Sequence, residues 1–321
     1  MWLCAANHTK RRRIMKKAYF YIDDTIWVLR DITRENNKSL FDNKFMNMLK
    51  TAHDKYGLKV QMNLFYRTDS FYGYDEFRLC DVTDKYKAEF EENSDWMKFA
   101  FHAMEEFPDY PHISATYDDT YKLFKMIEKE VFRFAGEKSF AYSVCPHWLP
   151  VSKAGVKALK DCGVTLLDCT AGDTAEYNGD PFSLPYGHAA RLLNNRQPET
   201  KVFTRGGRDT AIARSICGYN HFDTATEATI HGTNKAIYNE EIGLNFKKYC
   251  MTCLNTTPYE ELEEEFAPLL KYDYIGICDH EQYFYADYFN YQPDYDQKIY
   301  KMGEILNAAG FTFVGGEEIV D

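Results

Sequence analysis

Short apolar runs alternate with longer stretches of helical spacing along most of this 321-residue chain. This alternation limits the possible folds more than any other feature of the sequence. The apolar runs predict strands at residues 18–24, 59–66, 96–102, 139–145, 164–169, 272–278 and 311–315. The stretches between them predict helices at residues 41–56, 116–134, 152–162, 237–252, 258–270 and 295–309. Such an order is typical of a parallel sheet with helices outside it. We therefore predict an α/β protein built as a (β/α) barrel, either regular or in a distorted seven-stranded form.

Residues 171–235 interrupt this order. They carry turn sequences such as Asn178-Gly179-Asp180-Pro181 and Arg205-Gly206-Gly207 between short apolar runs. We expect an irregular insertion here, over the face where the strands end. No linker-like segment divides the chain, so residues 18–321 are predicted to form a single domain. The basic residues 1–17 are expected to be a disordered leader, because the apolar core of a signal peptide does not follow them.

The net charge and the cysteine content limit which partners and which cellular compartment we expect. The net charge of −11 argues against nucleic acid, which needs clustered Lys and Arg. No apolar run is long enough to span a bilayer, so we expect no membrane contact. An odd number of cysteines, nine, spread along the chain favours a reducing compartment and a cytoplasmic location. Cys250 and Cys253 form a lone CxxC pair, which we interpret as a chance spacing. The oligomeric state stays open.

Several predicted strands end in residues that bind metals or protons. Asp23 and Asp24 end the first strand, His102 the third, and Asp279-His280 a late one, while His147 follows another. Functional residues of barrel folds gather at these strand ends. Asp24 could hold a metal while Asp23 remains free as a base. The alternative is that Asp24 only caps the next turn.

The third ligand is open at this stage. Neutral imidazole is a common zinc ligand, which favours His102. Glu106, four residues further on, would complete the set if the segment coils, and His112 could fold back to do the same. The alternative for this segment is a solvated acidic loop. His280 could donate a proton to a leaving group, with Glu281 orienting it or acting instead.

Four motifs resemble the polysaccharide deacetylase (NodB-homology, carbohydrate esterase 4-like) superfamily. Tyr21-Ile22-Asp23-Asp24 is similar to the family's first motif, and His102-Ala103-Met104-Glu105-Glu106 to its histidine motif, with Glu106 in place of the second histidine. The third motif would fall near Cys145-Pro146-His147-Trp148, where the proline fits and the motif's arginine is missing. The segment from Ile275 to His280 matches the last. The likeness covers most of the chain in order, and implies a divergent member.

The resemblance implies a mechanism and a set of site residues. Asp23 would be the general base, Asp24, His102 and Glu106 would hold Zn²⁺ or a similar ion, and His280 would be the acid. His147, Trp148, Glu281 and His112 would contact an acylated oligosaccharide or small metabolite. Arg205 or Arg208 could replace the missing arginine. Two alternatives remain open: a metal-free glycoside hydrolase, and a sugar-binding protein without catalysis.

Overall fold

The computed structural model describes residues 15–68, 75–107, 110–170, 174–175, 215–216, 229, 236–248, 250–288 and 290–320. Its helices are α1 Trp27–Glu35, α2 Lys44–Tyr56, α3 Lys87–Glu92, α4 Tyr117–Phe134, α5 Lys153–Asp161, α8 Leu262–Phe266 and α9 Tyr295–Ala308. Its longer strands are β1 Lys16–Thr25, β2 Val60–Phe65, β3 Met97–Ala103, β5 Leu166–Thr170, β9 Leu244–Lys248 and β11 Tyr274–His280. Its short strands are β4 Ser143–Val144, β6 Thr174–Ala175, β7 Ser215–Ile216, β8 Ile237–Asn239, β10 Thr252–Cys253 and β12 Phe311–Phe313.

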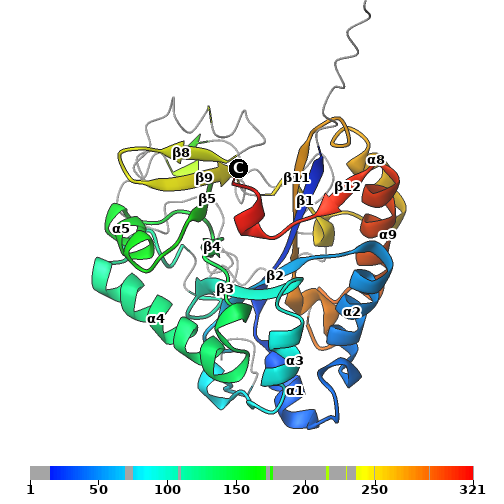
Figure 1. Ribbon diagram of the computed structural model, residues 1–321, viewed down its shortest axis with the longest axis horizontal. Coiled ribbons are helices and arrows are strands. Elements are labelled where there is room, and N and C mark those ends of the chain that lie inside the picture. The colour runs from blue at the N-terminus through cyan, green and yellow to red at the C-terminus, as the bar shows by residue number, and fades with distance from the viewer. Residues whose placement is uncertain are drawn as a thin grey trace, which may run out of the picture.

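The strands form two main sheets that are mostly parallel. The larger sheet has the order β10-β11-β1-β2-β3, with β12 also paired to β1, and all of its ladders are parallel. The second has the order β4-β5-β9-β8, in which β8 and β9 pair antiparallel. An isolated parallel bridge between Phe99 and Phe140 joins the two sheets at β3. In Figure 1 the helices lie around the outside of the strands. The predicted α/β class with a parallel sheet is confirmed.

Closure into a barrel is not shown. Within the part of the chain that the structure describes, no ladder joins β9 to β10. The small β6–β7 pair lies in the region predicted as an insertion, of which the structure describes little else. The closed barrel and the insertion over the strand ends therefore stay predictions.

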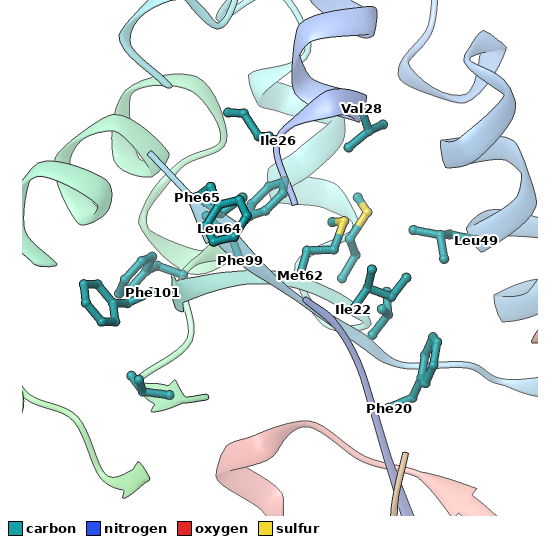
Figure 2. Close-up of a cluster of buried hydrophobic side chains, with 14 of the residues drawn as sticks. Phe20, Ile22, Ile26, Val28, Leu49, Met62, Leu64, Phe65, Phe99 and Phe101 are labelled. Atoms are coloured by element: carbon teal, nitrogen blue, oxygen red, sulfur yellow. The ribbon is translucent and has the colours of Figure 1, made fainter. Parts of the chain in front are cut away.

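Alternation along β1 separates an apolar face from a polar one. Phe20 and Ile22 belong to the main hydrophobic core between the strands and the helices. Figure 2 shows this layer, with Leu49 of α2 and Val28 of α1 on the same side as Ile22 and Met62. Each buried side chain of this size contributes about 1.5–3 kcal/mol relative to leaving it in water. The opposite face of β1 carries Tyr19, Tyr21 and Asp23, and this face leads to the site described below.

Local sequence signals define α2. The side-chain oxygen of Asn43 accepts hydrogen bonds from the backbone N–H groups of Phe45 and Met46, and so caps the first turn. The helix ends at Gly57, whose φ of 66° is a left-handed conformation that glycine adopts without strain. Both signals agree with the predicted helix at residues 41–56.

One predicted helix is wrong. Residues 237–248 form the hairpin of β8 and β9 in place of a helix, and Thr252 begins β10. Asn239 and Gly243 close its turn, since Gly243 N–H donates to Asn239 O and adopts a φ of 73°. Leu244 and Phe246 are both buried, which is the period of a strand.

Other boundaries also differ from the prediction. The helix expected at residues 258–270 is limited to α8 with a preceding 3₁₀ turn, and the strand expected at 139–145 is limited to β4. Lys16 and Lys17, predicted to lie in a leader, belong to β1 and pair with Phe311 and Thr312 of β12. The helix α1 was not predicted.

Among the described helices, none combines the length and apolar character that a membrane crossing requires.

Candidate metal centre

The end of β1 brings two adjacent carboxylates to one edge of the sheet. Neighbouring side chains of a regular strand point to opposite faces. Here the pairing of β1 with β2 shifts register between Ile22 and Thr25, and Asp24 adopts a φ of 61°. This irregularity turns Asp24 out of the strand pattern, so that its carboxylate and that of Asp23 both approach His102.

Three potential ligand atoms meet at this edge. Nε2 of His102 lies 3.1 Å from Oδ1 of Asp24 and 3.1 Å from Nδ1 of His147. Nδ1 of His147 lies 3.3 Å from the same carboxylate oxygen. All three side chains are buried. They come from β1, from β3 and from the segment between β4 and α5, so the fold itself assembles the group.

The outer hydrogen bonds of the two histidines leave their inner nitrogens free to bind a cation. Nδ1 of His102 donates to the carbonyl oxygen of Cys145 at 2.6 Å, and Nε2 of His147 donates to that of Glu106 at 3.0 Å. Metal-binding histidines usually donate their second N–H in this way. In the neutral tautomers that result, both inner nitrogens are acceptors, and they face a third acceptor on Asp24. Such a group requires a proton or a cation at its centre.

The spacing fits a small divalent ion. Ligand atoms bound to a tetrahedral Zn²⁺ at about 2.0–2.1 Å lie about 3.3 Å from one another. The three separations here are 3.1, 3.1 and 3.3 Å. Two imidazoles and one carboxylate are a ligand set that zinc accepts.

The charges of the group reinforce one another. Burial alone would raise the pKa of Asp24, but a proton on the inner nitrogen of His102 or His147 provides the hydrogen bonds and positive charge that hold it well below its ordinary value. Burial lowers the pKa of His102, yet the charges of Asp23 and Asp24 outweigh this effect and raise it. Gln282 fixes the second oxygen of Asp24, because its Nε2 donates to Oδ2 at 2.7 Å. Asp24 is therefore held as a carboxylate that faces the two imidazoles.

Asp23 stands beside this group in its own polar setting. Nδ2 of Asn63 donates to its Oδ1 at 2.6 Å, and the thiols of Cys278 and Cys145 lie 3.4 and 3.7 Å from its Oδ2. Asn63 is in turn linked through Gln61 to the backbone of Ser143. Neutral donors therefore orient the carboxylate of Asp23. The resemblance would assign this task to an arginine, which the third motif of this chain lacks. Arg205 and Arg208, the predicted replacements, lie outside the described residues.

Glu106 and His112, the two predicted candidates for the third ligand, both have backbone-linked contacts near His102 and His147. The backbone carbonyl oxygen of Glu106 accepts a hydrogen bond from Nε2 of His147. His112 donates from Nε2 to the carbonyl oxygen of His102 at 2.8 Å, and burial lowers its pKa to about 4. His112 thus stays neutral and braces the backbone of β3. His147, predicted as a substrate contact, instead lies within 3.1 Å of His102 Nε2 and 3.3 Å of Asp24 Oδ1.

Glu281 has a structural position. Its carboxylate accepts the backbone N–H groups of Ile26, Trp27 and Val28 at 2.7, 2.9 and 2.6 Å, which are the free donors at the start of α1. The side chain is fully buried, and burial raises its pKa to about 7. This position does not suit the predicted contact with substrate.

His280 and Trp148 lie closer to solvent. His280 is the register partner of Asp23 on β11, is half-buried, and has Nδ1 3.0 Å from Oδ1 of Asn255. Trp148 is half-buried beside His147, and its ring packs against Tyr110. Phe65 covers the two ligand histidines, at ring distances of 5.4 and 5.0 Å. An apolar wall therefore borders the ligand group.

Two residues that contact the carboxylates, Asn63 and Gln282, were not predicted from the sequence, and neither was the place of His147 next to Asp24. Asn63 had a signal, because it and Gln61 are the polar residues, two apart, in the otherwise apolar strand Val60–Phe65. Two polar residues at strand period mark one face. Gln282 had none, since its contact with Asp24 spans 258 positions.

Comparison with known proteins leaves the family open. No family model matches the sequence, and no curated protein matches it. Among solved structures, a 4-alpha-glucanotransferase from Thermococcus litoralis is similar with a TM-score of 0.47 and 9% identity, over 95% of this chain and 40% of that one. The catalytic domain of a peptidoglycan N-acetylglucosamine deacetylase from Eubacterium rectale ATCC 33656 is similar with a TM-score of 0.40 and 12% identity, over 94% and 88%. This chain thus spans less than half of the glucanotransferase. We rest the proposal below on the side chains of the site.

Proposed function

We propose that this chain is a metal-dependent hydrolase that removes an acyl group from a carbohydrate or a related small metabolite. The observation that carries the proposal is the triangle of acceptor atoms from Asp24, His102 and His147 beside the carboxylate of Asp23. The motif likeness of the sequence to polysaccharide deacetylases points the same way. In the proposed ligand set His147 replaces Glu106.

Zinc is our first choice of metal. Catalytic zinc sites hold the ion with three protein ligands and keep a fourth position for water or substrate. An ion held there polarises an acyl carbonyl and lowers the pKa of water from 15.7 to about 7. Asn63 keeps the carboxylate of Asp23 in place next to this position.

We assign the proton transfers to two residues on neighbouring strands. Asp23 accepts a proton from the attacking water as general base. His280, its register partner, delivers a proton from Nε2 to the leaving nitrogen or oxygen. One water is consumed, and the products are a carboxylic acid and a free amine or alcohol. Trp148 is the proposed contact for a sugar ring, since its half-buried indole borders His147.

The two alternatives from the sequence have less support. A glycoside hydrolase without metal needs two carboxyl groups that act on a glycosidic bond. Here Oδ1 of Asp24 is committed to two histidines, which leaves it poorly placed for that role. A binding protein without catalysis would not need a triangle of acceptors at the ligand separation of a metal.

Elemental mass spectrometry tests the metal. We expect the Asp24, His102, His147 group to hold one zinc ion per chain, and this ion should be lost in Asp24→Ala and His147→Ala. Glu106→Gln separates the two ligand sets, because it should keep the ion if His147 is the third ligand. His53→Ala is the control, since this histidine lies on α2 and bonds to the backbone of Leu58. Retention of this ion by His147→Ala, together with its loss from Glu106→Gln, would contradict our assignment.

Acetate release tests the reaction. The zinc-loaded protein should liberate acetate from N-acetylglucosamine oligomers or O-acetylated sugars. Asp23→Asn should abolish release while it keeps the bound metal. Zinc-loaded protein that releases no acetate from either class, with its metal in place, would refute the deacetylase assignment and leave a metal-binding protein of another function.

A further inference from the structure

Cys250 and Cys253, interpreted above as a chance spacing, lie next to a third thiol and a histidine. Cys253 ends β10 and is the register partner of Cys278 on β11. Two residues further along β11, His280 follows on the same face. The sulfurs of Cys253 and Cys278 and a ring nitrogen of His280 all lie within 4.8 Å of one another. Adjacent parallel strands therefore place these three groups together.

Cys250 adds a third sulfur. Its thiol lies close enough to those of Cys253 and Cys278 to raise the pKa of both. The segment that carries it is fixed to β11, because the N–H of Met251 donates to the carbonyl oxygen of Gly276 at 2.8 Å. The result is a C-x₂-C pair joined by a C-x-H pair from the neighbouring strand. Three thiols and one imidazole are the composition of many structural zinc sites.

We propose that Cys250, Cys253, Cys278 and Nδ1 of His280 form a second metal site, which takes Zn²⁺ or another thiophilic divalent ion. Sγ of Cys253 lies 3.8 Å from Nδ1 of His280. Around a tetrahedral zinc with Zn–S of about 2.3 Å and Zn–N of about 2.0–2.1 Å, this separation is about 3.6 Å. The pair therefore needs to close by only a few tenths of an ångström to share one ion.

The surroundings suit soft ligands. Cys278 is buried, Cys250 and Cys253 are half-buried, and burial raises the pKa of both Cys253 and Cys278. Thiols in such a place become thiolates when a bound cation compensates their charge. Thiolate ligands then select zinc over magnesium or calcium, which prefer oxygen.

Asn255 contacts two of the four groups, Cys253 and His280, from outside. Its Oδ1 lies 2.8 Å from Sγ of Cys253 and 3.0 Å from Nδ1 of His280. Turning the amide by 180° exchanges this oxygen for its N–H₂ group, which then donates to the thiolate sulfur. Hydrogen bonds to ligand atoms of this kind are usual around protein metals, because they orient the first ligands.

This second site borders the first without sharing a ligand atom with it. Sγ of Cys278 lies 3.4 Å from Oδ2 of Asp23. A metal on Nδ1 of His280 would leave the ring proton on Nε2. The thiol site would fasten β10 to β11 and hold His280 in one tautomer beside Asp23. Its existence does not depend on the hydrolase assignment.

Metal counting on the full chain tests the inference. The wild type, reloaded with zinc under reducing conditions and freed of excess, should contain two ions per chain. The Cys253→Ser and Cys278→Ser variants should each keep one, as should His147→Ala. Cobalt substitution gives a second readout, because thiolate ligation adds a charge-transfer absorption that His147→Ala retains and Cys278→Ser loses. Cys162→Ser is the matched control, as a buried thiol outside the cluster.

The outcomes separate the two sites. One ion per chain, lost with His147 and unaffected by the cysteine variants, would overturn the thiol site and leave the proposed function standing. One ion lost with Cys253 or Cys278 and retained in His147→Ala would do the reverse. A Cys250–Cys253 disulfide in the freshly purified protein, with no thiolate absorption on cobalt, would also refute the proposal. Cys253→His guards against a folding defect, since it should bind metal where Cys253→Ser does not.

Discussion

Replacement of Lys247 by methionine tests how the polar face of the sheet is stabilised. Nζ of Lys247 lies 2.5 Å from Oδ1 of Asp168, and the two side chains are 1% and 3% exposed. The same Nζ lies 5.1 and 5.4 Å from the ring centroids of Tyr19 and Tyr21. Methionine fills similar space without the charge. Breaking one partner of a buried pair costs about 3–5 kcal/mol, because the other charge loses its compensation.

The free energy of unfolding that Lys247→Met loses should depend on pH. Burial raises the pKa of Asp168 to about 6 although Lys247 opposes this. Since the unfolded value is about 3.9, the stability linked to this group is complete below pH 4 and is lost as the pH rises through about 6. Without Lys247 the carboxyl stays protonated to higher pH, so the variant continues to lose stability above pH 6. The difference in unfolding free energy between the wild type and the variant then grows by about 1.4 kcal/mol per pH unit, or about 3 kcal/mol by pH 8.

Urea unfolding of the wild type and Lys247→Met at pH 5 and pH 8 measures this gap. We expect a loss of about 1 kcal/mol or less at pH 5 and of about 3–4 kcal/mol at pH 8. Lys247→Met with Asp168→Asn should show little dependence on pH relative to the wild type beyond pH 6. Lys50→Met is the surface control, because its pair with Asp54 is exposed and worth under about 1 kcal/mol. An equal loss at both pH values would refute the charge argument and indicate lost packing.

Two further changes separate the roles of site and core. Asn63→Ala removes the donor that lies 2.6 Å from Oδ1 of Asp23. Turnover of the zinc-loaded protein should therefore fall at least about tenfold, while its metal content stays at the wild-type value. Loss of the metal itself would contradict the role assigned to Asn63. In Gly303→Ala, the added Cβ would meet the Tyr56 ring at 2.6 Å, and overpacking of about 1–3 kcal/mol should lower the unfolding temperature. A Tyr56→Ala background should remove this penalty, and if the penalty persists there, contact with Tyr56 is not its cause.

The parallel strands were predictable because burial on both faces leaves nearly continuous apolar runs. Residues 60–65 and 274–279 are buried throughout, and both strands lie within two residues of their expected bounds. The missed helix α1 lacks any local start signal. Its first three N–H groups are accepted by Glu281, more than 250 positions away, and Ile26 provides no side-chain cap. A contact between residues so far apart in the chain cannot be predicted from a short window of sequence.

The residues of the site also differ in how far the sequence could predict them. Asp23, Asp24 and His102 could be found as polar ends of apolar strands. The choice of Glu106 rested on helical spacing, which holds only within a helix, whereas β3 ends at Ala103 and no helix follows directly. His147 reaches the group from beyond β4, and its position depends on an irregular backbone. No periodicity encodes such a segment.

Backbone strain is concentrated at this group, and that distribution supports a functional interpretation. Among the described residues, five other than glycine have a positive φ, and three of them are Asp24, Trp148 and Leu149. Each such residue costs of the order of 1–3 kcal/mol and persists only where its surroundings enforce it. For Leu149, at 73°, the cost is highest, because a bulky side chain is rare in this region. These residues fix the backbone at two of the three proposed ligands, Asp24 and His147. A protein that needed only a stable core would gain by relaxing both turns, whereas a metal centre needs both carboxylates and the second imidazole turned inward at once.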